Sequence, residues 1–129
     1  MTDSQTHSPD RLALMVLFVL QAVMLAAMLA RVPPHPPFDV GPFAMGPFLG
    51  AALAAVLAAW LAGGVQSGAG RWLSLVALVL ALISYGPHKW LDAAIPQIWP
   101  AVVAAQIACA VVIWKLAVAW NAARRGQAG

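Results

Sequence analysis

The chain has 129 residues, of which 63% are hydrophobic and only 9% are charged, and its mean hydropathy is +0.84. So few polar groups cannot cover the surface of a soluble domain, which excludes a soluble globular protein and predicts an integral membrane protein. The formal net charge of +3 arises from seven Lys and Arg residues that lie at the ends of apolar stretches instead of on one basic face. Nucleic acid is therefore not an expected partner.

Four apolar stretches predict an all-α membrane protein with four transmembrane helices, because a helix needs about 20 mostly apolar residues to cross a bilayer. We expect these spans at about 11–31, 42–63, 71–86 and 93–120. The first stretch is longer than the apolar core of a secretory signal, so we expect it to be retained as a helix.

Each gap between the apolar stretches contains residues that end a helix. Segment 32–37 is rich in proline, which lacks an amide donor and clashes with the preceding helical turn. Segment 63–70 is rich in glycine, and Gly86 followed by Pro87 closes the third helix. The short connections predict a single domain over 1–129 that forms an up-down bundle.

Positive charges predict the orientation of this bundle. With four spans, both termini lie on one side of the membrane. That side carries Arg11, Arg71, Lys115, Arg124 and Arg125, whereas the other side carries Arg31 and Lys89. Because cytoplasmic segments are enriched in Lys and Arg, we expect the N- and C-termini in the cytoplasm and the two remaining loops in the periplasm of a bacterial inner membrane.

The two outer loops share a pattern of residues. Aligning the two halves of the chain superposes His35 on His88, Asp39 on Asp92 and Pro47 on Pro100. The alignment predicts a possible tandem repeat of two helical hairpins, 11–63 and 71–120, with the same orientation in the membrane. A chance match stays open because the chain contains ten prolines.

These loops also offer the residues best suited to chemistry. If they meet, His35, His88, Asp39 and Asp92 supply two imidazoles and two carboxylates, a ligand set suited to zinc, copper or iron. In the alternative interpretation, the aspartates cap the helices that follow and the histidines are ordinary polar residues at the membrane surface. No catalytic residue or cofactor follows from the sequence, and an enzyme is the less expected outcome.

Small residues recur at every fourth position of the second helix and predict a packing surface. They are Gly46, Gly50, Ala54 and Ala58. Such residues let two helix backbones approach closely in lipid. The alternative is that alanine is simply abundant in this chain.

Two amide side chains, Gln21 and Gln106, fall near the middle of their predicted spans. They could hydrogen-bond to each other across a pair of helices. No charged residue is expected at mid-depth, which argues against a proton relay or an ion-coupled transporter.

Together these features favour a small membrane protein that acts as an accessory, assembly or scaffold subunit of a larger membrane complex. Its expected partners are the lipid bilayer and either other membrane proteins or further copies of itself. One alternative is a small membrane enzyme, or a metal- or quinone-binding protein, that uses the His–Asp loops. A second alternative is an oligomeric carrier of small molecules, although no polar stripe is present to line a path.

Overall fold

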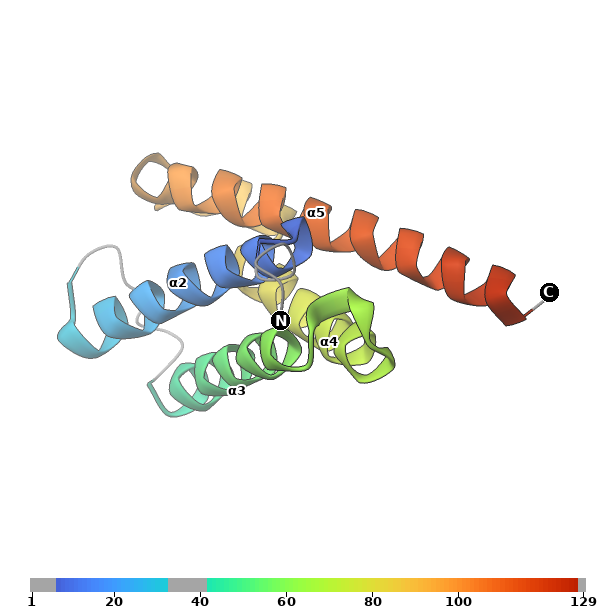
Figure 1. Cartoon of the computed structure of the whole chain (residues 1–129). Helices are drawn as coiled ribbons and strands as arrows, with labels where there is room; N and C mark the ends of the chain where they lie inside the picture. The colour runs from blue at the N-terminus through green and yellow to red at the C-terminus, as the bar shows by residue number, and fades with distance from the viewer. Residues whose placement is uncertain (1–6, 33–41, 128–129) are drawn as a thin grey trace.

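The computed structural model of the chain describes residues 7–32 and 42–127, which fold into a bundle of four helices (Figure 1). The helices are α2 (Pro9–Ala30), α3 (Pro42–Leu61), α4 (Gly68–Tyr85) and α5 (Ile95–Gln127). Two short 3-10 helices, η1 (Gly64–Gln66) and η2 (Pro87–Leu91), lie in the connections before and after α4. The expected all-α fold with four helices is confirmed, and the arrangement is consistent with a helical bundle.

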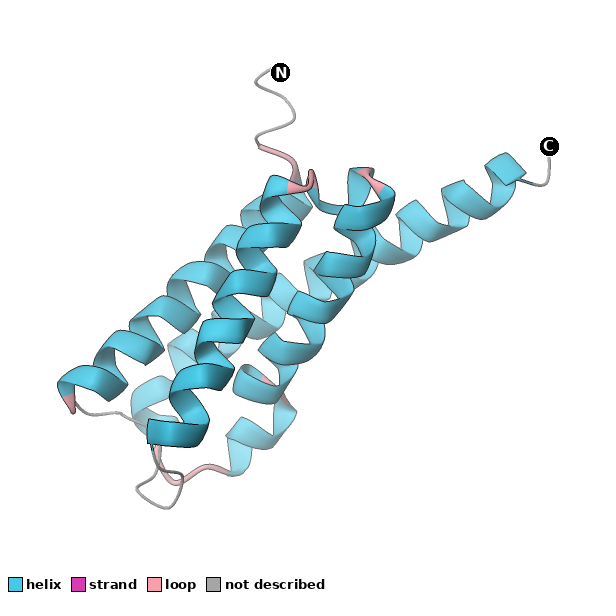
Figure 2. Ribbon diagram, turned by 90° about the horizontal axis from the view of Figure 1, so that it is seen from below, coloured by secondary structure: helices cyan, strands magenta, loops and turns pink. Residues whose placement is uncertain are grey.

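The four helices pack in a ring. Both α2 and α4 contact α3 and α5, whereas α2 and α4 face each other diagonally and contact each other much less. Figure 2 shows the start of α2 and the connection from α3 to α4 at one end of the bundle, and α5 projects beyond that end. The connection from α4 to α5 lies at the opposite end, which we call the outer end.

Three helical segments are long and apolar enough to cross a membrane, namely Pro9–Ala30, Gly68–Leu91 and Ile95–Gln127. Helix α3 contributes a shorter apolar segment, Met45–Leu61. Large apolar side chains also point outward, among them Val23, Leu29, Trp72, Ile107 and Trp114. These properties are consistent with an integral membrane protein, whose outer surface contacts lipid.

The helix boundaries follow from local sequence. Helix α2 begins at Pro9, in the first turn, where a missing amide costs least. The Ser67 hydroxyl caps α4 by accepting a hydrogen bond of 2.8 Å from the Gly70 amide. Helix α4 ends at Tyr85, and η2 begins two residues later at Pro87. Helix α5 continues to Gln127, beyond residue 120 where the expected membrane span ends, because the alanine-rich segment 117–125 contains no glycine or proline.

The core relies on close approach of the helices more than on bulky side chains. Its fully buried alanines are Ala52, Ala59, Ala77, Ala81 and Ala105. Small side chains at these positions bring neighbouring backbones together, which increases van der Waals contact in the way that stabilises helix pairs in lipid. The larger buried side chains include Leu14, Leu17, Leu49, Val56 and Val112.

Candidate functional site

The structure describes one of the two His–Asp loops, at the outer end of the bundle. His88 is exposed on η2. One carboxylate oxygen of Asp92 accepts a hydrogen bond of 2.9 Å from the Ala94 amide, and the other lies 3.7 Å from Lys89 Nζ. Asp92 therefore stabilises the turn that leads into α5, a common role for an aspartate in this position.

The other loop, with His35 and Asp39, lies outside the described residues. Within 7–32 and 42–127, no group of three His, Cys, Asp or Glu residues is placed to hold a metal ion. The four-residue metal site therefore stays a prediction. Its described half offers an exposed imidazole at His88 and a carboxylate that already has other partners at Asp92.

The small residues of α3 point away from the rest of the bundle, and we call them the α3 stripe: Gly46, Gly50, Ala54 and Ala58. Gly50 and Ala54 are exposed, and Gly46 and Ala58 are half-buried. A Cβ atom added at Gly46 or Gly50 would meet nothing within 4 Å beyond its own stretch of helix.

The opposite face of α3 makes the contacts within the chain. It places Leu49, Ala52, Val56 and Ala59 in the interior, each with no exposed surface. The α3 stripe thus takes little part in packing the described bundle, and it leaves a smooth apolar surface without a partner in the described part of the chain.

The two amides expected at mid-depth are not brought together. Gln106 Oε1 accepts a hydrogen bond of 3.2 Å from Trp90 Nε1, and Gln106 Nε2 donates one of 3.3 Å to the Tyr85 carbonyl. Gln21 is fully buried in α2, and neither of its amide atoms has a hydrogen-bond partner in the described bundle. Gln106 therefore connects α5 to the last residue of α4 and to Trp90 of η2, and the anticipated pair with Gln21 does not form.

A polar junction, which the sequence alone did not suggest, joins the start of α2 to the end of α3 and the connection that follows. Asp10 is fully buried, and its Oδ2 accepts a hydrogen bond of 3.0 Å from the Val65 amide. Arg11 is only 4% exposed; its Nη2 donates to the Trp60 carbonyl at 3.1 Å, and its guanidinium carbon lies 4.3 Å from the centre of the Trp60 ring. These contacts include a charge-assisted hydrogen bond and a cation–π interaction, both favourable where water is scarce.

Glycine is required at this junction. Gly64 has a φ of +60°, and a Cβ there would collide with the Asp10 carboxylate. A Cβ at Gly70 would collide with the Gly64 carbonyl. The only signals in the sequence were an Asp-Arg pair at the start of the first apolar stretch and the glycine-rich segment 63–70, and neither indicates that the two segments meet.

The α3 stripe is the largest unpartnered feature among the predicted site residues. It carries no titratable group, so it can bind another apolar surface but cannot supply acid–base or nucleophilic chemistry.

No family model matches the sequence, no curated protein matches it, and no solved structure matches its fold.

Proposed function

We propose that this chain is an accessory, assembly or scaffold subunit of a larger membrane complex. The observation that carries the proposal is the outward position of the α3 stripe, where Gly50 and Ala54 are exposed and a Cβ at Gly50 would meet nothing. Lipid tails are as apolar as the helices themselves, so helices associate in a bilayer through close packing at small residues. The stripe would receive a helix of another membrane protein or of a second copy.

The proposal places all four helices across a bacterial inner membrane. Helix α3 has 20 residues, and at about 1.5 Å per residue it is about 30 Å long, which equals the typical thickness of the hydrocarbon core. The other three segments meet the length and composition required of a spanning helix. An accessory subunit needs little more than such a bundle, because its contacts lie within the bilayer.

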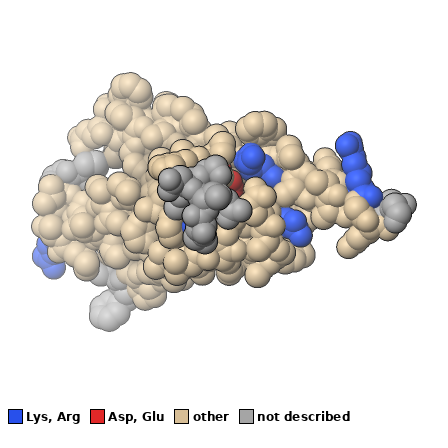
Figure 3. Space-filling view, in the orientation of Figure 1, with Lys and Arg blue, Asp and Glu red and all other residues tan. Residues whose placement is uncertain are grey.

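In this arrangement the termini face the cytoplasm. The end of the bundle at the start of α2 and the projecting end of α5 carries Arg11, Arg71, Lys115, Arg124 and Arg125. In Figure 3 one group of Lys and Arg atoms lies at the left end, and the others lie between the middle of the view and the right end, the direction in which α5 projects. Trp72 and Trp120, whose ring centres are 5.8 Å apart, lie toward the same cationic end, as aromatic residues do at a membrane boundary.

The test is purification of the tagged chain from its native membrane in mild detergent, followed by identification of the proteins that come with it. We expect Gly50→Leu and Ala54→Leu to lose the partner. Ala110→Leu is the matched control, since Ala110 is exposed on α5, away from the stripe. Equal recovery of partners with all three variants would rule out assembly through α3, and release of the chain by alkaline carbonate would rule out the membrane placement.

A further inference from the structure

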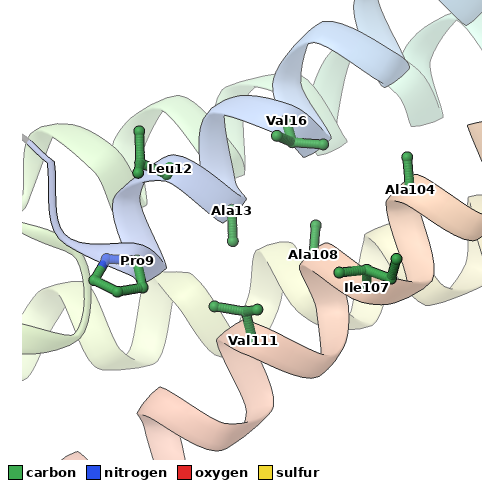
Figure 4. Close-up of a pocket in the computed structure, with 8 residues that line it drawn as sticks. All are labelled: Pro9, Leu12, Ala13, Val16, Ala104, Ile107, Ala108 and Val111. Carbon is green, nitrogen blue, oxygen red and sulfur yellow. The ribbon is translucent and has the colours of Figure 1, made fainter.

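An apolar groove runs along the outside of the bundle between α2 and α5 (Figure 4). Its volume is about 450 Å³. The buried Ala13 and Ala108 form its floor, and its walls are Leu12 and Val16 of α2 and Ile107 and Val111 of α5. The groove follows α2 from Pro9 to Val16, which is about 11 Å of helix.

The face of α5 that lines this groove also carries Lys115, a positively charged residue. Lys115 follows Val111 by one helical turn, which places it on the same face about 6 Å further along the axis. Its Nζ lies 5.6 Å from the centre of the Trp114 ring, and Trp114 as a residue is 61% exposed. The apolar groove therefore ends at an aromatic and cationic pair on the cytoplasmic side of the proposed arrangement.

Lys115 has no carboxylate partner in the described part of the chain. The two carboxylates there are Asp10 and Asp92. Asp10 is buried against the Val65 amide, and Asp92 is paired with Lys89 at the outer end. The positive charge of Lys115, at the end of the groove, is therefore available to an anionic group from outside the described bundle.

We propose that the groove binds an anionic phospholipid, with one acyl chain along the α2–α5 surface and the phosphate beside Lys115. This inference rests on the proposed membrane placement. A helix of a partner protein would have to bring a carboxylate to the level of Lys115, whereas the cytoplasmic leaflet already supplies anionic headgroups at that depth. Trp114 lies where a side chain with an apolar body and one N–H donor is favoured, at the headgroup boundary.

The test reconstitutes the full chain in vesicles of equal parts phosphatidylcholine and phosphatidylglycerol and counts the lipids retained by native mass spectrometry. We expect phosphatidylglycerol to be enriched on the wild-type protein. Lys115→Gln should lower this enrichment about fivefold, the effect of removing one cation at an anionic surface. Ala104→Leu, which fills the groove from α5, should reduce the number of lipids retained.

Two matched controls keep the test specific. Arg124→Gln removes a cation from a different face of α5, and Ala110→Leu adds the same bulk outside the groove, so both should retain lipid as the wild type does. Absence of enrichment, or equal losses for Lys115→Gln and Arg124→Gln, would overturn the proposal. So would conversion of a dimer to a monomer by Ala104→Leu without change in bound lipid, which would assign the groove to a second copy.

Failure of the lipid site is distinguishable from failure of the proposed function. A chain that resists carbonate extraction and loses its partner in Gly50→Leu, yet retains no phosphatidylglycerol, overturns the lipid site alone. Release of the chain by carbonate overturns both.

Discussion

Both faces of α3 carry small residues, but the small residues on the two faces have opposite surroundings. On the inner face, Ala52 and Ala59 have no exposed surface and let neighbouring helices approach α3. On the outer face, Gly50 and Ala54 are exposed and have little to pack against in the described bundle. Small residues at a spacing of four therefore identify one face of a helix, but they do not determine whether that face packs within the chain or against another molecule.

The largest expected effect comes from adding bulk to the inner face. Ala52→Leu must displace neighbouring helices, and we expect it to lower the free energy of unfolding by about 1–3 kcal/mol. Ala54→Leu, two residues away on the other face, should change the free energy of unfolding by less than about 0.5 kcal/mol. Unfolding by dodecyl sulfate in mixed micelles, followed by far-UV circular dichroism, measures both. Equal losses would show that the two faces are equivalent.

Near the end of α3, the carbonyl and the ring of Trp60 both contact the Arg11 side chain. Arg11→Leu removes the hydrogen bond to the Trp60 carbonyl and the interaction with its ring, and should lower the free energy of unfolding by about 1–2 kcal/mol. Arg124→Leu, an exposed position at the projecting end of α5, is the control and should have almost no effect. The same unfolding titration compares them, and indistinguishable midpoints would contradict the role of Arg11.

Two amide side chains, one without and one with hydrogen-bond partners, should give smaller effects on stability. Gln21→Leu removes two buried amide atoms without partners, so the free energy of unfolding should stay the same or rise by up to about 1 kcal/mol. Gln106→Leu removes hydrogen bonds to Trp90 and Tyr85 and should lower it by about 1 kcal/mol. Unfolding titrations of the Gln21→Leu and Gln106→Leu variants measure both effects. A clear decrease in the free energy of unfolding for Gln21→Leu would show that the Gln21 amide has a hydrogen-bond partner in the folded protein.

Some of the fold was predictable because its causes are local. Gly86 and Pro87 end α4 through backbone chemistry that acts within a few residues, and runs of apolar residues set the number of helices. Helix α5 runs on to Gln127, past the predicted membrane span of 93–120, because the helix propensity of its last turns does not depend on packing against the bundle.

The contacts that join distant parts of the chain were not predictable in the same way. Asp10 meets Val65 across 55 positions of sequence, and the partners of Gln106 depend on where η2 brings Trp90. The outward direction of Gly50 is likewise decided by which side of α3 the other helices occupy. A single sequence does not fix these choices, because they arise from the relative rotation of packed helices.

Photo-crosslinking from the α3 stripe in native membranes tests directly whether this surface contacts another protein chain. With the buried Cys109 replaced by alanine, single cysteines are introduced as Gly50→Cys, Ala54→Cys and, on the exposed face of α5, Ala110→Cys. With each thiol labelled by benzophenone maleimide, which on irradiation bonds to nearby C–H groups of any neighbouring chain, we predict a crosslinked product of larger mass from the two α3 positions and none from Ala110→Cys. Crosslinking from Ala110→Cys alone, or from none of the three, would contradict assembly through the α3 stripe.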